Sequence, residues 1–363
     1  MHFLRASISL LLCGAILSHG EEISGEKRLI KVAEDKPAEW MDQDEIWGLI
    51  KAETNFVDVT GHNFPVVKQE DFNTAAIPTT IRFRSVVEAL FSLLDTSRMI
   101  TFVMSFSQFH TRYYTSQTGI ESQAFLRRQV DVSLFGYAGN YTVEEFEHTW
   151  VGQKSIIVRI TGTDATLRNE VVILGAHQDS INTGGSTLSA PGADDNASGS
   201  VVVLETLRVI AEQNFIPKRT LEFHWYAAEE VGLRGSGEIA SSYKDRNINV
   251  VSMVNYDVPG YLVPNRNEIR IVNDYVEPTL STFLTLIVDE YLAVRWTRYS
   301  CGYGCSDHAS WFNYGFPSAR PAEAVYHPGM HTVTDVITAV GFEQVKEFTK
   351  LAVGYVVEMS EPS

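Results

Sequence analysis

Cysteine is scarce in this chain of 363 residues, which contains three. Cys13 lies in an apolar N-terminal stretch, so only Cys301 and Cys305 remain for the rest of the chain. Two thiols this close can form half of a zinc site, but no second cysteine pair exists to complete one. In an oxidising compartment a disulfide is the simpler interpretation. Gly302 and Gly304 give the backbone the freedom to close so small a loop.

Positive charge is also in short supply. Lysine and arginine together number 29, against 45 aspartate and glutamate residues, which leaves a formal net charge of −16. An acidic surface repels the phosphate backbone of DNA and RNA. We therefore expect no nucleic-acid partner, although the charge by itself says nothing about the fold.

Long apolar stretches are confined to the beginning of the chain. Residues 6–17 follow Arg5, are apolar and are too few to span a bilayer. Ser18 and Gly20 are small residues at the positions that a signal peptidase needs. A buried N-terminal helix is the alternative, but nothing N-terminal to it could cover it. We predict a signal peptide over residues 1–20, secretion to the extracellular space and no membrane contact.

The residues after this leader divide into two parts. Residues 21–77 are charged and short of long apolar runs, with one short helix expected around 40–52. They form either an ordinary N-terminal subdomain or a pro-segment that is removed after export. Residues 78–363 have the pattern of one compact domain. A sequon at Asn140 predicts glycosylation on the surface of that domain.

The compact domain begins with helical periodicity and then alternates strands with helices. β-branched runs predict the strands, and apolar residues three and four apart predict the helices. Such alternation implies an α/β fold, a three-layer sandwich whose mixed, largely parallel sheet is covered by helices on both faces. The expected strands are 154–160, 170–175, 219–227, 250–257 and 268–273, and the expected helices are 86–94, 100–112, 121–132, 198–213, 232–243, 278–292 and 342–359.

Three of the expected strands end in acidic residues or histidine. The first runs into His177 and Asp179, the second into Glu229 and Glu230, and the third into Asp257. In open α/β sheets the active site lies beyond the carboxyl ends of the strands. These side chains should therefore meet at one edge of the sheet.

A fourth stretch, residues 191–199, precedes a helix and brings Asp194 to the same edge. Each piece taken alone also has an ordinary explanation. The glutamates can be a solvated pair, the aspartates can cap a helix or end a strand, and His177 can be a core histidine. Four such coincidences at strand ends favour a functional site.

Carboxylates gathered at one edge repel each other unless a cation neutralises them. Imidazole and carboxylate ligands together suit zinc. Two Zn²⁺ ions carry four positive charges, which three carboxylates and a bridging hydroxide would balance. Glu229 is then left over as an acid–base group. The second histidine ligand must come from late in the chain, where His308, His327 and His331 are candidates.

Four motifs carry a resemblance to a known family. With these motifs in the same order along the chain, the sequence is similar to the secreted bacterial and fungal leucyl aminopeptidases, which are two-zinc exopeptidases. The similarity runs from about residue 100 to the C-terminus. The motifs are HQDS at 177–180, APGADDNASG at 190–199, AAEEVGLRGS at 227–236 and CGYGCSDHASW at 301–311.

The resemblance implies a role for each candidate side chain. It implies that the peptide bond between Asp194 and Asp195 is cis. It selects His331 rather than His327 as the late ligand. The implied metal ligands are Asp194 as the bridge between two Zn²⁺ ions, Glu230 and His331 on one ion, and His177 and Asp257 on the other, with Glu229 as general base and Asp179 holding the His177 ring.

The same resemblance describes the substrate pocket. A disulfide between Cys301 and Cys305 would lie beside the pocket, with Tyr303 near the substrate. Arg320 and Ala322 stand where the relatives have larger apolar residues around the first side chain, and the loop before His331 is shorter. A buried guanidinium needs a partner, and we expect it to be Glu323. Fungal relatives also carry a removable, inhibitory pro-segment, which favours that interpretation of residues 21–77.

The sequence thus predicts a secreted zinc aminopeptidase that uses a metal-bridged hydroxide. It would remove leucine or other apolar residues from peptides with a free N-terminus, and a monomer is expected. Three alternatives stay open: a carboxypeptidase of the same fold, for which Arg320 would bind the terminal carboxylate; a glutaminyl cyclase-like enzyme with one zinc; and an inert binding domain.

Overall fold

A computed structural model describes residues 27–65 and 67–363 of the chain. The predicted signal peptide and Cys13 lie outside the described residues. Within the described residues, no helix is long and apolar enough to cross a membrane.

The centre of the molecule is a six-stranded sheet with the strand order β11-β8-β6-β7-β5-β4. The first four of these strands are parallel, and β5 is antiparallel to both of its neighbours, β7 and β4. This confirms a mixed, largely parallel sheet. The strands are β4 (Tyr141–Phe146), β5 (Ser155–Ile160), β6 (Glu170–His177), β7 (Thr220–Tyr226), β8 (Asn249–Asn255) and β11 (Ser318–Ala319).

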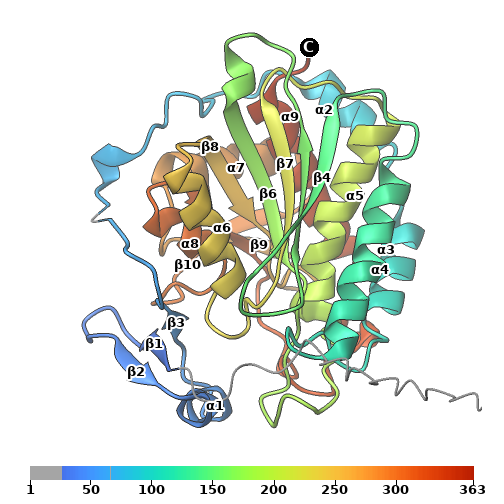
Figure 1. The fold of residues 1–363 in the computed structure, drawn as a ribbon. Coiled ribbons are helices and arrows are strands. Elements are labelled where there is room, and N and C mark those ends of the chain that lie inside the picture. The colour runs from blue at the N-terminus through green and yellow to red at the C-terminus, as the bar shows by residue number, and fades with distance from the viewer. Residues whose placement is uncertain (1–26, 66) are drawn as a thin grey trace, which may run out of the picture.

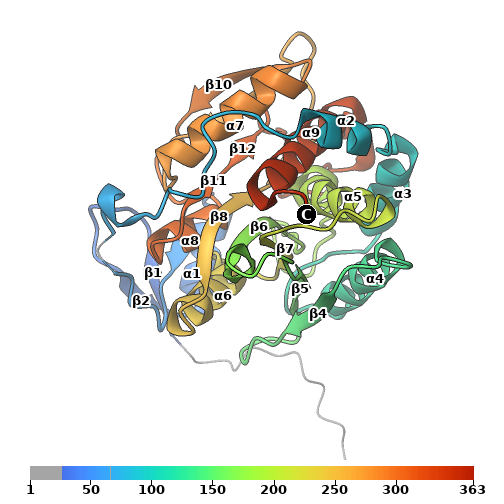
Figure 2. The ribbon, with the colours of Figure 1, turned by 90° about the horizontal axis from the view of Figure 1, so that it is seen from above.

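Both faces of this sheet are buried, as alternate residues of β6 show. Val172 and Leu174 belong to the core that α5 and α9 cover, whereas Val171 and Ile173 belong to the core under α6 and α8. Figures 1 and 2 show these helices on opposite sides of the sheet. A strand buried on both faces needs a continuous apolar run, and β6 supplies one. The helices are α2 (Arg84–Phe91), α3 (Thr96–Phe106), α4 (Gln117–Ser133), α5 (Gly199–Glu212), α6 (Arg234–Asp245), α7 (Pro278–Tyr291), α8 (His308–Asn313) and α9 (Phe342–Ser360).

A second, three-stranded sheet packs beside the first. Its order is β10-β9-β12, with β10 parallel and β12 antiparallel to β9. Its strands are β9 (Glu268–Val272), β10 (Arg295–Tyr299) and β12 (Pro321–Ala322). Elsewhere in the described chain there are short helical turns, which are η1 (Gln69–Asp71), η2 (Leu167–Asn169), η3 (Ala193–Ser198) and η4 (Ile337–Ala339).

The N-terminal residues form a small unit of their own, drawn in blue in Figure 1. It consists of β1 (Arg28–Lys31), β2 (Glu39–Met41), α1 (Gln43–Lys51) and β3 (Val57–Asp58), with the sheet order β2-β1-β3. Asp42 and Glu45 begin the helix with reciprocal side-chain-to-backbone bonds. The sequence predicted this helix but not the sheet.

This N-terminal unit is anchored on the loop that follows β7. The Asp58 carboxylate binds both Arg28 at 3.3 Å and Arg234 at 3.2 Å, and the Asp58 N–H donates to Gly232 O at 3.0 Å. Ile30 and Ile46 of the unit share a core with Val231 of that loop, among others. The unit is therefore packed against the segment that carries Glu229 and Glu230.

The packing between α9 and the sheet yields a stability prediction. Phe348 is fully buried in the large core, so Phe348→Ala should lower the free energy of unfolding by about 3–5 kcal/mol. Urea denaturation measures the loss. Phe135→Ala is the matched control, because Phe135 is 92% exposed and its removal should change stability by less than about 0.5 kcal/mol. Equal losses in both variants would contradict this packing.

Candidate metal centre

The sequence-predicted residues gather at the carboxyl ends of the central parallel strands. His177 is the last residue of β6, Glu229 and Glu230 follow β7, and Asp257 follows β8. A turn of irregular backbone at η3 adds an aspartate, and the loop between β12 and η4 adds His331. Parallel strands bring these distant stretches together because their carboxyl ends share one edge.

The first group of donor atoms surrounds the His177 ring. Its Nε2 lies 3.1 Å from Asp195 Oδ1 and 3.3 Å from Asp257 Oδ1. All three side chains are buried. One imidazole nitrogen and two carboxylate oxygens thus converge within the space of one ion.

The second group surrounds the His331 ring. Its Nε2 lies 2.9 Å from Asp195 Oδ2 and 3.0 Å from Glu230 Oε2. Asp195 thus gives one oxygen to each group. Two groups of three donors that share a carboxylate have the geometry of a bridged two-metal site.

Charge explains why such a cluster needs a cation. Burial lowers the pKa of the His177 and His331 rings, but the surrounding carboxylates outweigh it and raise both pKa values well above the usual range. Burial raises the pKa of Glu230 to about 7 and that of Glu229 well above its usual value. A proton bound to either ring or to either glutamate would reduce the repulsion among the crowded carboxylates. Metal ions would replace them, since metal ligands must be deprotonated.

Asp195 gives an oxygen to each donor group, whereas Asp194, which was expected to be shared, belongs to neither group. The Asp194 carboxyl instead accepts the Gly260 N–H at 2.9 Å and lies against Glu323. The cis peptide bond is likewise between Asp195 and Asn196, not between Asp194 and Asp195. Asp195 has an extended backbone conformation, in which adjacent side chains point to opposite sides. Only one of two consecutive aspartates can then face the site.

Asp179 holds the backbone of the glutamate pair. Its two oxygens accept the N–H groups of Glu229 at 3.1 Å and Glu230 at 3.2 Å. Its Oδ1 is 3.5 Å from His177 Nδ1, which has no hydrogen-bond partner among the described residues. Asp179 thus lies beside the His177 ring as expected, but its hydrogen bonds to the glutamate loop are the shorter contacts.

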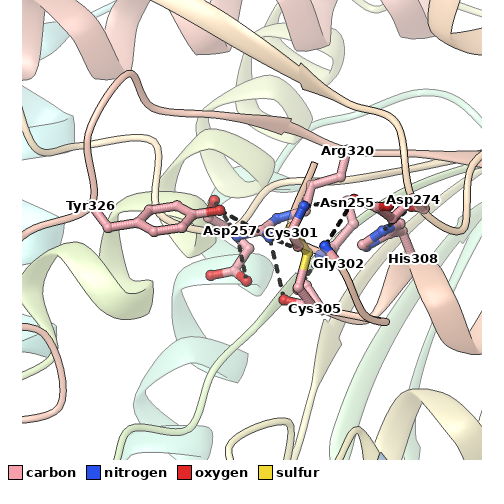
Figure 3. Close-up of a disulfide and its surroundings, with 10 residues drawn as sticks. Asn255, Asp257, Asp274, Cys301, Gly302, Cys305, His308, Arg320 and Tyr326 are labelled. Carbon is pink, nitrogen blue, oxygen red and sulfur yellow. Dashed lines mark hydrogen bonds and ion pairs between the residues drawn. A yellow bond between two sulfur atoms is a disulfide. The ribbon is translucent and has the colours of Figure 1, made fainter. Parts of the chain in front are cut away.

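Cys301 and Cys305 form the expected disulfide. Asp274 Oδ2 anchors the loop by accepting the N–H groups of Cys301 at 2.6 Å and Gly302 at 3.2 Å. Figure 3 shows the Arg320 guanidinium lying among the disulfide, Tyr326 and Asp257.

Arg320 pairs with Asp257, which corrects the expected pairing with Glu323. Its Nη2 is 3.0 Å from Asp257 Oδ2, and its Nη1 donates to Cys305 O at 3.3 Å. Glu323 instead accepts the Tyr261 N–H. Residues 320 and 323 flank β12, and in an extended chain residues three apart point to opposite faces. The guanidinium is therefore compensated by a donor of the first group.

The remaining predicted residues lie outside the two donor groups. Tyr303 is close enough to Arg320, Glu229 and Asp257 for their charges to influence its pKa, which burial raises. Asn140 is exposed just before β4, where a glycan can be attached. Neither His308 nor His327 belongs to the two donor groups.

Arg112 is a residue that the sequence analysis missed. It is fully buried, and it donates to main-chain oxygens on either side of the site, from Nε to Gln178 O at 2.9 Å and from Nη2 to Gly192 O at 2.8 Å. Burial lowers the pKa of its guanidinium to about 10, although nearby carboxylates including Asp335 and Asp195 oppose the shift. Nothing in its sequence context distinguishes it from the end of a helix.

Comparison with known proteins identifies similar sequences and a similar fold. Residues 155–356 match peptidase family M28. Leucine aminopeptidase 1 of Aspergillus fumigatus is 40% identical over 356 residues, which cover 92% of this chain and 89% of that protein. Leucine aminopeptidase 1 of Aspergillus clavatus is 37% identical over a match that covers 98% of this chain and 96% of that protein. The crystal structure of the Legionella pneumophila LapA aminopeptidase superimposes with a TM-score of 0.81 at 26% identity, covering 92% and 94%.

The two aspartates can be told apart experimentally. Asp195→Asn should strongly weaken metal binding in both groups, because each loses a carboxylate oxygen, whereas Asp194→Asn should retain the metals. Metal analysis after dialysis at neutral pH measures the difference. Asp194→Asn is the matched control, since it makes the same chemical change one residue away. Metal loss in Asp194→Asn alone would return the bridging role to Asp194.

Proposed function

The chain belongs to peptidase family M28 and is a hydrolase that acts as an aminopeptidase, and we propose that it is a secreted enzyme with two zinc ions that removes apolar residues from the N-terminus of peptides. The observation that carries the proposal is the Asp195 carboxylate, which lies between two donor groups. A site for a single ion has no need of such a bridge.

The donor set fits zinc. Imidazole nitrogens and carboxylate oxygens are zinc ligands in catalytic sites. Two divalent ions bring four positive charges against three carboxylates, so the filled site is close to neutral. His177 and Asp257 would hold one ion, Glu230 and His331 the other, and Asp195 both. When bound, a zinc pair lowers the pKa of water and polarises the scissile carbonyl group.

Glu229 is the carboxylate that neither donor group uses. Its backbone N–H is fixed by Asp179, and its side chain is close enough to His177 for their charges to interact. From this position it can accept the proton of the attacking water and return it to the leaving amine. Asp179 supports this role by holding the backbone of both glutamates.

The walls near Asp257 suit an apolar first residue. Tyr303, Tyr326 and the disulfide surround the Arg320 guanidinium, and Asp257 compensates its charge. We therefore assign Tyr303 and Arg320 to the pocket for the first side chain, with no free cation exposed to the substrate. The α-amine of the substrate would bind beside the carboxylates of the centre.

We also propose how the enzyme is processed. Residues 1–20 would direct export, and Asn140 would carry a glycan on the mature monomer. Residues 21–77 would be a pro-segment. The support is the N-terminal unit's contact with Val231 and Gly232, immediately after the glutamate pair. While attached, the unit lies against the loop on which turnover depends.

A panel of peptides tests the proposal against its rivals. The enzyme should release residues from free N-termini and leave N-blocked peptides intact. Release from the C-terminus would favour a carboxypeptidase, although the guanidinium of Arg320 is already bound by Asp257. Cyclisation of N-terminal glutamine would favour a glutaminyl cyclase. Binding without turnover would favour an inert domain.

Metal content and turnover should respond differently in the two glutamate variants. The wild type should contain two zinc ions and lose activity on chelation. Glu229→Ala should keep both ions but lose most of its kcat, about 10²- to 10⁴-fold for a lost acid–base group, whereas Glu230→Ala should lose zinc. Elemental analysis and steady-state kinetics measure both. Metal loss in Glu229→Ala alone would mean that the two roles are exchanged.

Substrate preference tests the assignment of Arg320. Because Asp257 compensates its charge, the wild type should have a higher kcat/KM for leucyl than for glutamyl or aspartyl substrates. Arg320→Met should not increase leucyl activity, since the guanidinium does not fill the pocket. Arg246→Met, at an exposed position, is the matched control. A higher kcat/KM for glutamyl than for leucyl substrates in the wild type would contradict the assignment.

A further inference from the structure

Asp335 is a buried carboxylate four residues beyond His331. Its Oδ1 accepts the Asp194 N–H at 2.8 Å, and its Oδ2 accepts the Asp195 N–H at 2.9 Å. Its own main-chain oxygen accepts the Ala193 N–H at 3.1 Å. Only 1% of Asp335 is exposed. One residue therefore holds three consecutive peptide groups of the stretch that carries the shared donor.

The same device recurs on the other side of the centre. Asp179, two residues beyond His177, accepts the N–H groups of Glu229 and Glu230 with its two oxygens. In each case a segment that carries a histidine donor supplies a carboxylate, which holds the backbone of a segment that carries an acidic donor. The two bidentate carboxylates thus connect the four segments in pairs.

Asp195 has the least tolerance for displacement in this arrangement. Its Oδ1 lies 3.1 Å from His177 Nε2, and its Oδ2 lies 2.9 Å from His331 Nε2. The side chain of aspartate is short, so the position of its backbone determines where both oxygens lie. A shift of the carboxylate that brings it closer to one histidine nitrogen takes it away from the other.

We propose that Asp335 is a positioning residue for Asp195, which keeps the shared carboxylate in register with both donor groups. Asp335 acts through the backbone and contributes no donor atom of its own to either group. Its attachment to the His331 loop makes the second histidine and the shared carboxylate move together. The inference rests on the proposed function, in which these groups bind metal.

A purely structural role is the alternative, and the chain contains a matched control for it. Glu358 in α9 is buried and accepts two consecutive backbone N–H groups, those of Arg82 and Phe83, both at 2.9 Å. It lies near the amino end of β7, where the Arg219 N–H donates to Ser360 O. This is the end of the sheet opposite to the metal centre, as the position of the C-terminus in Figure 1 shows.

The experiment compares Asp335→Asn with Glu358→Gln in the full chain. Three quantities are measured: the zinc dissociation constant by chelator competition, the free energy of unfolding of the metal-free protein, and kcat and KM. Both variants should be less stable. Only Asp335→Asn should weaken zinc binding, by about 10- to 100-fold as for other residues that orient metal ligands, and lower kcat more than it changes KM.

Asp335→Glu provides a second test should Asp335→Asn fail to fold. It keeps the charge and both acceptor oxygens but displaces them by one methylene group, so zinc binding should again weaken. Wild-type zinc affinity in either Asp335 variant, with a stability loss like that of Glu358→Gln, would overturn the positioning role alone. A wild-type protein that binds no zinc would instead overturn the proposed function, and this inference with it.

Discussion

The two oxygens of Asp195 are shared between two groups of donors, and the rest of the centre is built around this constraint. The oxygens of one carboxylate keep a fixed separation, so both histidine nitrogens must approach them from positions that match it. Those histidines come from the end of β6 and from a loop more than 150 residues later. The central sheet and the C-terminal loop must therefore be positioned with a precision that packing alone rarely supplies.

Backbone hydrogen bonds supply that precision. A buried carboxylate is costly unless polar groups compensate it. Asp179 and Asp335 satisfy this requirement by accepting pairs of N–H groups, and in doing so they hold the donor segments. Arg112 connects the two halves further, since it binds the main chain beside His177 and before Asp195. The charges that stabilise the centre also define its geometry.

Two neighbouring features come close to the same site from distant parts of the chain. The N-terminal unit contacts the glutamate loop through Asp58, and the disulfide loop contacts Asp257 through Arg320. Arg320 thus joins the disulfide loop to a member of the first donor group, so in the proposed enzyme substrate preference and metal binding would share a residue. A change at either feature is expected to reach the reacting groups through one intervening contact.

Much of the fold was predictable from the sequence. The continuous apolar run in β6 and the alternation of strands with helices require a sheet that is buried on both faces. Spacing and motifs also brought His177, Glu230, Asp257 and His331 to one edge. The sheet of the N-terminal unit was not predictable, because its strands are short and charged and are stabilised by the domain on which they pack.

The sequence by itself determined which kinds of side chain meet and at which edge of the sheet, because local apolar patterns specify strands and parallel strands share their carboxyl ends. Tertiary structure decided the rest. Whether Asp194 or Asp195 faces the site depends on a backbone held by Asp335, a residue 140 positions away from Asp195. Likewise, Arg320 finds Asp257 rather than the nearby Glu323 because side-chain direction follows the local strand. When the interaction partner of a side chain depends on its orientation and lies far away in the sequence, the local sequence carries no signal of that pairing.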